Sequence, residues 1–335
     1  MNNIQPYIKQ FDGLISNSNN VLIVQADNPD ADSLGSAVAL EQLLMSLGKE
    51  TYLYSAVPMP TYLKYVRGWD RVSNILTNNY DLTIFVDVST TTLIKKMIDL
   101  NHMNKIQKKP IIVIDHHDTV NRKLDYADLS IVLGDKSSTG QIIYEIAKAN
   151  NYKINNLFLE SILISILGDT QGLSNQLVKP DTYRIVADIV ENGVNRLDID
   201  ERRKEYTSYP FEVYMYKASL INRTEFHKDN QIGLLLLNQD DITNYSPLYN
   251  QAPLMHPEIL GINGLKVSIV LKIYSDGHLT GSVRTNNKYP IAAKISDYFD
   301  GGGHEYASGF NLTGVNYDNF KKQLISQTSK LLDNL

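Results

Sequence analysis

Acidic and histidine residues follow four apolar runs of this sequence, and side chains of these types could hold divalent metal ions. The runs end at Val24, Val86, Ile114 and Leu167. The candidate ligands that follow them are Asp30, Asp32, Asp87, Asp115, His116, His117 and Asp169. Carboxylate oxygens and imidazole nitrogens, together with water, suit Mn²⁺ or Mg²⁺. The pattern therefore predicts a divalent metal site for phosphoryl chemistry.

The segment Asp115–His117 is the most specific of these signals. Histidine is the commonest metal ligand in proteins, and a neighbouring carboxylate often orients its ring. Three such groups directly after one strand are hard to explain by packing, so we interpret them as metal-binding or catalytic. Each remaining carboxylate also has a structural interpretation, as part of an acidic turn (Asp30 and Asp32), a helix cap (Asp87) or a helix-ending turn (Asp169).

A glycine-rich segment near the C-terminus could bind an anion. Residues 301–303 are consecutive glycines, and His304 follows them. Glycines let backbone N–H groups approach a phosphate closely, and His304 adds a side chain that could donate to it. Arg284, on a nearby predicted strand, could grip a phosphate with two hydrogen bonds. Ser308 lies in a stretch of small residues just beyond the histidine. A flexible glycine turn is the alternative interpretation.

Strands and helices alternate in the first half of the chain. Apolar runs predict strands over 21–26, 51–54, 82–86 and 111–114. Apolar spacing and capping residues predict helices over 7–18, 34–47, 90–102, 139–149, 155–167 and 180–192. This alternation predicts a parallel sheet with helices on both faces and a loop over 118–136. The carboxyl ends of such strands meet where ligands bind, so we expect the metal-ligand candidates to converge there.

The fold class predicted for the whole chain is α/β with two domains. The segment 196–205 is highly charged and predicts a solvated helix between them. We therefore expect a metal-binding domain over 1–195, a linker helix over 196–216 and a smaller α/β domain with a mixed sheet over 217–335. In this second domain, the pattern predicts strands over 232–237, 267–271 and 281–284, a hairpin turn at 275–277 and helices over 291–299 and 317–333.

Composition limits the classes of function. The chain has 335 residues, of which 43% are hydrophobic and 21% charged, so it can bury two cores. Its net charge of −5 argues against a protein that coats long duplex nucleic acid. The absence of cysteine excludes disulfides, zinc–thiolate sites and thiol nucleophiles. We expect a cytoplasmic protein without a signal peptide or a membrane partner, because no basic-to-apolar leader and no membrane-length apolar run is present.

These motifs resemble those of the DHH family of phosphoesterases. The matching residues are Asn28–Ser33, Asp87, Asp115–His117 and Asp169. The segments Gly301–His304 and Ala307–Gly309 resemble the signature of the C-terminal domain associated with this family. More narrowly, nearly the whole chain resembles the branch that contains nano-RNases and phosphoadenosine-phosphate phosphatases.

The resemblance implies a centre with two Mn²⁺ ions, for which Mg²⁺ is also suitable. The metal ligands that it implies are Asp30, Asp32, Asp87, His116 and Asp169. Asp87 would bridge the ions, with Asp30 on the first and the other three on the second. His117 would steady the cluster or the scissile phosphate, so the expected catalytic residues are Asp87, His116 and His117. The residues expected to bind the far end of the substrate, between the domains, are Arg284, Gly302, Gly303, His304 and Ser308.

One position departs from the family pattern. The first motif usually begins with a histidine two residues before its Asn-Pro-Asp, and this chain has Ala26 there. Alanine cannot coordinate a metal, so the first site is either weak or rebuilt with oxygen from Asp27 or Asn28. Oxygen ligands would favour Mg²⁺ or Mn²⁺ over softer metals.

The function expected from these features is hydrolysis of dinucleotides and short oligonucleotides to mononucleotides by a metal-activated water. An enzymatic alternative is phosphatase action on 3′-phosphoadenosine 5′-phosphate, or cleavage of a linearised signalling dinucleotide. Inorganic pyrophosphatase action ranks below these, because the glycine–histidine segment goes with nucleotide-cleaving members. The non-enzymatic alternative is a nucleotide-binding protein whose metal centre is degenerate at Ala26. A homodimer is compatible with the resemblance, but no feature of the chain requires one.

Overall fold

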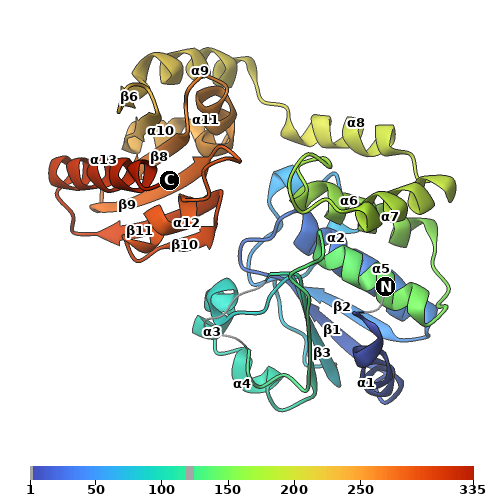
Figure 1. Cartoon of the computed structure of the whole chain (residues 1–335). Helices are drawn as coiled ribbons and strands as arrows, with labels where there is room; N and C mark the ends of the chain where they lie inside the picture. The colour runs from blue at the N-terminus through green and yellow to red at the C-terminus, as the bar shows by residue number, and fades with distance from the viewer. Residues whose placement is uncertain (1–2, 118–123) are drawn as a thin grey trace. The chain divides into compact units, whose positions relative to one another are not determined.

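The computed structural model describes residues 3–117 and 124–335 and divides into two compact units (Figure 1). The first unit spans Met1–Ser208 and the second Tyr209–Leu335. The segment 118–123, at the start of the predicted loop, lies outside the described residues.

A five-stranded parallel sheet forms the centre of the first unit. Its strands are β1 (Asn20–Val24), β2 (Glu50–Tyr54), β3 (Leu82–Val86), β4 (Ile111–Asp115) and β5 (Leu129–Val132), in the order β2-β1-β3-β4-β5. Every neighbouring pair is parallel, which confirms the predicted sheet. The structure corrects one detail. The strand β5 lies inside the predicted loop, where the apolar residues Leu129 and Ile131 alternate with polar ones over too short a run to stand out.

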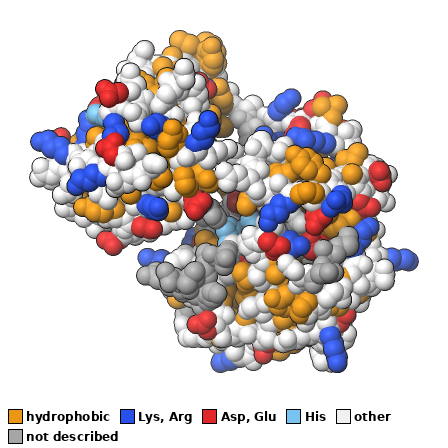
Figure 2. All heavy atoms as spheres, in the orientation of Figure 1, with side chains coloured by type: hydrophobic (Ala, Val, Ile, Leu, Met, Phe, Trp, Pro, Cys, Tyr) orange, Lys and Arg blue, Asp and Glu red, His pale blue; other side chains and the backbone are white. Residues whose placement is uncertain are grey.

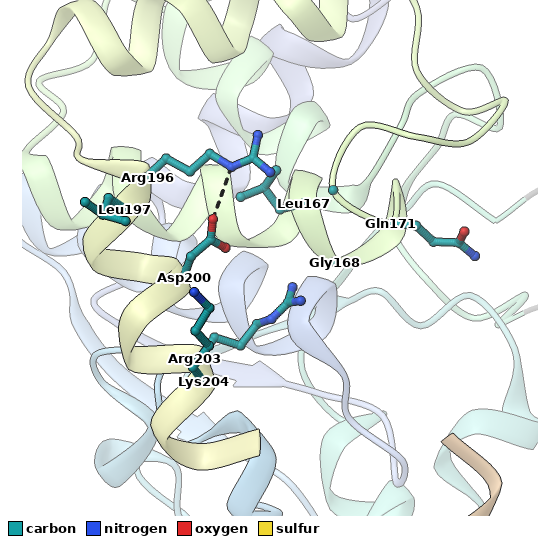
Figure 3. Close-up of a pocket in the computed structure, with 9 residues that line it drawn as sticks. Leu167, Gly168, Gln171, Arg196, Leu197, Asp200, Arg203 and Lys204 are labelled. Carbon is teal, nitrogen blue, oxygen red and sulfur yellow. Dashed lines mark ion pairs between the residues drawn. The ribbon is translucent and has the colours of Figure 1, made fainter. Parts of the chain in front are cut away.

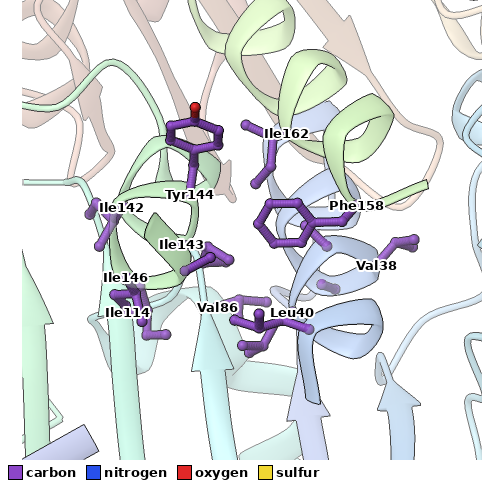
Figure 4. Packing of buried hydrophobic residues seen from close by; sticks show 14 of the residues in the cluster. Val38, Leu40, Val86, Ile114, Ile142, Ile143, Tyr144, Ile146, Phe158 and Ile162 are labelled. Atoms are coloured by element: carbon purple, nitrogen blue, oxygen red, sulfur yellow. The ribbon is translucent and has the colours of Figure 1, made fainter. Parts of the chain in front are cut away.

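Helices cover both faces of this sheet, as its doubly buried strands require. One face packs against α2 (Ala31–Ser46), α5 (Thr139–Ala149) and α6 (Asn156–Asp169). Figure 4 shows Leu40, Ile143 and Phe158 of these helices over Val86 and Ile114 of the sheet. The other face packs against α3 (Lys95–Asp99) and α4 (Met103–Ile106). A single helix was predicted over 90–102. The structure instead has the 3₁₀ turn η3 (Thr91–Ile94) followed directly by α3, and the next helix, α4, begins at Met103.

Two further helices of the first unit frame this core. The helix α1 (Gln5–Ser16) buries Phe11 and Ile15 in the same cluster as α2. The helix α7 (Pro180–Glu191) begins at a proline, which is favoured at the first helical position. Two 3₁₀ turns, η1 (Thr61–Leu63) and η2 (Trp69–Arg71), lie between β2 and β3.

The predicted linker helix over 196–216 is two helices in the structure. The first, α8 (Arg196–Thr207), belongs to the first unit, and α9 (Phe211–Arg223) belongs to the second. Pro210 precedes α9 and separates the two, because the residue before a proline is disfavoured in helical geometry. The charge pattern of 196–205 identified a helix correctly but did not show that it ends at Thr207.

The second unit is built on a six-stranded mixed sheet. Its strands are β6 (Glu225–His227), β7 (Ile232–Leu237), β8 (Val267–Ile273), β9 (His278–Thr285), β10 (Gly302–His304) and β11 (Ala307–Thr313), in the order β10-β11-β9-β8-β7-β6. Only β7 and β8 are parallel among these pairs. Its helices after α9 are α10 (Gln239–Tyr245), α11 (Gln251–Leu260), α12 (Ala292–Asp297) and α13 (Tyr317–Asp333). The mixed sheet agrees with the fold predicted for this half.

Gly302 and Gly303 belong to a strand of a hairpin and do not form the flexible glycine turn considered above. Gly303 pairs with Ser308 across β10 and β11 and has a φ of +139°. A Cβ atom at Gly303 would lie 2.6 Å from the Ala307 carbonyl oxygen, so no larger residue fits without a shift. The glycines therefore allow two strands to approach closely.

Acidic and basic side chains are interspersed on the face of the molecule shown in Figure 2. Such mixing agrees with the modest net charge of −5. Among the described residues, every helix is too short or too polar to cross a membrane.

Candidate metal centre

The structure brings four of the five predicted ligands, Asp32, Asp87, His116 and Asp169, together at the carboxyl ends of β1, β3 and β4, which are adjacent in the sheet. Two groups of side chains place their ligand atoms within 4.8 Å of one another. One contains Asp87, His116 and His117, and the other contains Asp32, His116 and Asp169. Asp169 reaches this edge from the C-terminal end of α6. His116 belongs to both groups and is therefore the centre of the arrangement.

The Nε2 atom of His116 faces three carboxylates. It lies 2.7 Å from Asp169 Oδ2, 3.5 Å from Asp32 Oδ2 and 4.0 Å from Asp87 Oδ1. The atom is buried, and the contact with Asp169 is the shortest of the three. The other ring nitrogen, Nδ1, lies 3.4 Å from the carbonyl oxygen of Lys136. An N–H at Nδ1 directed at that carbonyl would leave the Nε2 lone pair available to a metal.

Asp32 is fixed by a buried network. Its Oδ1 accepts hydrogen bonds from the hydroxyls of Ser36 (2.8 Å) and Ser165 (2.6 Å), and its Oδ2 accepts one from the Thr139 backbone N–H (2.8 Å). The Gly140 N–H adds a longer bond of 3.3 Å. These donors come from α2, α5 and α6, so the carboxylate is held at the point where the three helices meet. The sequence identified Asp32 but not Thr139 and Ser165, whose spacing carries no metal-ligand signal.

Asp87 has an unusual backbone conformation. It follows β3 directly, and its φ of +59° lies in the left-handed region. Strain of this kind in a non-glycine residue costs energy and is concentrated at functional sites. Its N–H donates to the Ile114 carbonyl (2.9 Å), and its Oδ1 accepts from the Thr139 hydroxyl (3.2 Å). The turn directs the carboxylate toward His117, whose Nδ1 lies 3.4 Å away.

Asp30 lies at the start of α2 and caps it. Its Oδ1 accepts a hydrogen bond from the Ser33 N–H (2.9 Å), as the structural interpretation of this turn predicted. Its oxygens lie outside the two groups of clustered ligand atoms. Desolvation and the charges of Asp169 and Asp32 nevertheless raise the pKa of Asp30 to about 7, although the residue as a whole is exposed. Asp30 is therefore a neighbour of the cluster and a helix cap at the same time.

Asp115 orients His117. Its Oδ1 accepts hydrogen bonds from the backbone N–H (3.0 Å) and the ring Nδ1 (2.7 Å) of His117. Burial would raise the pKa of Asp115, but these bonds outweigh it and hold the pKa below its ordinary value. Burial would lower the pKa of His117, but the same contact raises it. The pair is the carboxylate–histidine arrangement expected from the sequence.

The concentration of negative charge calls for a cation. Burial and the neighbouring carboxylates raise the pKa of Asp87 well above its ordinary value and also raise that of Asp32. Burial would lower the pKa of His116, but contact with Asp169 and the charge of Asp32 raise it to about 9. Buried carboxylates this close are unfavourable unless a proton or a metal ion neutralises them. The oxygen-rich donor set, with one imidazole nitrogen among the carboxylates, fits Mn²⁺ or Mg²⁺.

Ala26 and Asp27 show how the first motif departs from the family pattern. Ala26 is buried in an apolar cluster with Leu22 and Val24. The Asp27 Oδ2 accepts a hydrogen bond from the Lys96 backbone N–H (2.6 Å), next to the start of α3. Asp27 is thus committed to α3 and lies outside both groups of clustered ligands. Its Oδ1 is buried without a hydrogen bond.

The residues expected to bind substrate lie on one sheet of the second unit. Arg284 of β9 pairs with Ala307 of β11, beside the hairpin that contains Gly302, Gly303 and His304. The guanidinium donates to the Val283 carbonyl (2.9 Å) and forms no ion pair in the described parts of the chain. Burial lowers the pKa of Arg284.

The hydroxyl of Ser308 has an internal role. It donates to the Ala292 carbonyl (2.6 Å) and contacts the Ser296 hydroxyl (2.6 Å), which ties β11 to α12. Ser308 therefore positions the hairpin in this structure.

A model of the DHH family, N-terminal domain, matches residues 20–166. The match includes β1, β3 and β4 with all the ligand candidates except Asp169, which lies just beyond its end. The DHH resemblance predicted from the motifs is thus confirmed.

Two known proteins are similar over most of both chains. A probable bifunctional oligoribonuclease and PAP phosphatase NrnA from Streptococcus mutans is 24% identical and aligns over 87% of this chain and 89% of its own. The bifunctional oligoribonuclease and PAP phosphatase NrnA from Thermus thermophilus is 24% identical and aligns over 87% of this chain and 83% of its own.

A solved structure supports the fold. The crystal structure of an exopolyphosphatase-related protein from Bacteroides fragilis matches with a TM-score of 0.85 at 21% identity and covers 98% of both chains. This similarity confirms the α/β fold predicted from the sequence.

Proposed function

We propose that this chain, whose residues 20–166 match the DHH family N-terminal domain, is a metal-dependent phosphoesterase that hydrolyses dinucleotides and short oligonucleotides to mononucleotides. The proposal rests above all on the buried Nε2 of His116, which faces the carboxylates of Asp32, Asp87 and Asp169. The names of the relatives from Streptococcus mutans and Thermus thermophilus supply the substrate class.

The proposed ligands are Asp32, His116 and Asp169 for one metal ion, Asp30 for the other, and Asp87 for both. Two Mn²⁺ ions, or Mg²⁺ in their place, would neutralise the phosphoryl group and activate a water molecule. The protein contributes a rigid frame, because hydrogen bonds from three helices hold Asp32. His117, oriented by Asp115, would donate a hydrogen bond to the scissile phosphate.

The second unit would bind the end of the substrate that is not cleaved. Arg284 is a cation without a carboxylate partner in the described chain, which suits a terminal phosphate. The backbone of Gly302 and Gly303 and the residue His304 complete the proposed surface, with Ser308 holding the hairpin in place.

The direct test is turnover by the purified chain. With Mn²⁺, we expect a labelled dinucleotide to be converted to mononucleotides, and a chelator to stop the reaction. A chain that consumes no dinucleotide at any Mn²⁺ concentration contradicts the proposal.

Two alternatives predict different products. Since the relatives are named as bifunctional, phosphatase action on 3′-phosphoadenosine 5′-phosphate is the second candidate, and faster phosphate release from that compound would favour it. Binding of a dinucleotide without turnover would favour a binding protein that is degenerate at Ala26.

A further inference from the structure

A basic pocket lies in the first unit, between the C-terminal end of α6 and the helix α8. Its volume is about 570 Å³, and its lining includes Gly168, Gly172, Arg196, Asp200, Arg203 and Lys204. Three cations and one carboxylate leave a local surplus of positive charge in a chain whose net charge is −5. Figure 3 shows the charged side chains of α8, those of Arg196, Asp200, Arg203 and Lys204, beside the C-terminal end of α6. The composition of the pocket favours an anionic ligand.

The described residues give an acidic partner to one of the three cations. Arg196 forms an ion pair with Asp200, with 3.5 Å between Nε and Oδ2 (Figure 3). Within residues 3–117 and 124–335, Arg203 and Lys204 form no ion pair. An arginine and a lysine side by side on one wall can bind a phosphate through charge-assisted hydrogen bonds.

The pocket adjoins the metal centre. Gly168, which lines it, directly precedes Asp169. A Cβ atom added to Gly168 would lie 2.8 Å from the Cβ of Ala31, the residue between Asp30 and Asp32. Burial raises the pKa of Tyr65 to about 12, and the charges that act on this phenol include both Arg203 and Asp30. A phosphate in the pocket would therefore be a near neighbour of one at the metal centre.

The helix α8 is fixed to the first unit, so its cations have a defined position. Ile199 is buried in the core of that unit. Arg202 donates to the Tyr65 carbonyl (3.0 Å) and forms an ion pair with Glu160 of α6 at 2.6 Å. Arg202 thus anchors the helix, and this leaves Arg203 and Lys204, the next residues, for the pocket.

We propose that this pocket is a phosphate-binding subsite that holds a second internucleotide phosphate of the substrate. The inference rests on the proposed function and extends it. A dinucleotide has one internucleotide phosphate, which the metal centre would hold, so only longer strands would fill the pocket. A free phosphate compound, such as pyrophosphate, has the same chemistry and could occupy it instead.

The test compares the double variant Arg203→Ala/Lys204→Ala with a charge-matched control. The control is Arg184→Ala/Lys153→Ala, which removes one arginine and one lysine of the first unit from outside the pocket and the metal centre. Binding of a labelled pentanucleotide is measured by fluorescence anisotropy in chelator. We expect the pocket variant to bind about tenfold more weakly, as loss of charge-assisted hydrogen bonds implies, and the control to bind like the original chain.

Two further measurements distinguish the source of the phosphate. If it belongs to the strand, the ratio of kcat/KM for pentanucleotide to that for dinucleotide falls about tenfold in the pocket variant. If the pocket binds a free phosphate compound, pyrophosphate raises the melting temperature of the original chain in chelator but not that of the pocket variant. Either result supports the subsite. Equal pentanucleotide binding and equal pyrophosphate response in all three proteins overturns it. The binding arm decides the matter even if the original chain cleaves no strand, so the two proposals fail separately.

Discussion

Asp115 accepts two hydrogen bonds from His117 through one oxygen, Oδ1, at 3.0 Å from the backbone nitrogen and 2.7 Å from the ring nitrogen Nδ1. This contact fixes both the turn after β4 and the rotation of the ring. Since the raised pKa of His117 depends on the same carboxylate, the pair also controls whether the ring can donate a proton or hydrogen bond.

The first prediction concerns this pair. Asp115→Asn keeps the size of the side chain but removes its charge, so it should lower kcat by about 10-fold to 100-fold, the usual cost of losing an orienting carboxylate. The limb of the pH–rate profile that depends on protonated His117 should move to lower pH, because the pKa of His117 falls when the carboxylate that raises it becomes neutral. Steady-state kinetics over a pH series measure both effects. An unchanged profile would mean that His117 acts independently of Asp115.

The second prediction concerns Asp87, the proposed bridging ligand. Asp87→Asn should abolish turnover, and asparagine is chosen because it tolerates the left-handed φ of +59° better than alanine. In chelator the variant should melt at a higher temperature than the original chain, because a buried carboxylate repelled by its neighbours has been neutralised. Added Mn²⁺ should stabilise the original chain but not the variant. Differential scanning calorimetry with and without Mn²⁺ checks these outcomes, and a variant stabilised by Mn²⁺ as strongly as the original would contradict the assignment.

How much of this centre the sequence could predict depends on the kind of information involved. Convergence of Asp32, Asp87 and His116 was predictable, because parallel strands place their carboxyl ends at one edge. The left-handed φ of Asp87 was not, since it depends on the tertiary contact with Ile114 and Thr139. The hydrogen bonds that Thr139 and Ser165 donate to Asp32 could not be predicted either, because these residues lie more than a hundred positions from Asp32 in the sequence.

In the second unit and in α8, too, the sequence predicted some features and not those that depend on tertiary contacts. The strands β7, β8 and β9 were visible as apolar runs, whereas β10 consists of glycines and a histidine and becomes a strand only by pairing with β11. The charge pattern over 196–205 predicts a solvated helix. Its anchoring depends on Ile199 and on the contact of Arg202 with Glu160, which is distant in the sequence.

The third prediction tests the departure at Ala26. Ala26→His should tighten the binding of the Mn²⁺ ion proposed at the first motif, because it returns a nitrogen ligand there. Ala26 is buried among Leu22 and Val24, so the control is Ala26→Leu, which adds bulk without a ligand atom. Isothermal titration with Mn²⁺ compares the three proteins. If histidine and leucine have equal effects on Mn²⁺ affinity, position 26 does not face the metal.

The fourth prediction concerns the stability of the second unit, where His256 of α11 is buried between two serines. Its Nδ1 lies 2.8 Å from the Ser268 hydroxyl and its Nε2 lies 2.9 Å from that of Ser282. Burial and the charge of Arg284 lower the pKa of His256 to about 3. The ordinary value is about 6.5, so between these pH values the unfolded state binds more protons than the folded state. Stability from this residue is therefore present above about pH 6.5 and is lost as the pH falls, by at most about 1.4 kcal/mol per pH unit.

The measurement is urea unfolding at about pH 7.5 and about pH 5.5, where linkage predicts a lower midpoint for the second unit at the acidic pH. The variant His256→Gln keeps a side chain that can hydrogen-bond the serines but does not titrate, so its second unit should lose less stability on acidification. Trp69, the single tryptophan, lies in the first unit, and its fluorescence reports that unit as an internal control. Far-UV circular dichroism reports both units. If the midpoint of the second unit shifts equally in both proteins, His256 is not the residue that senses pH.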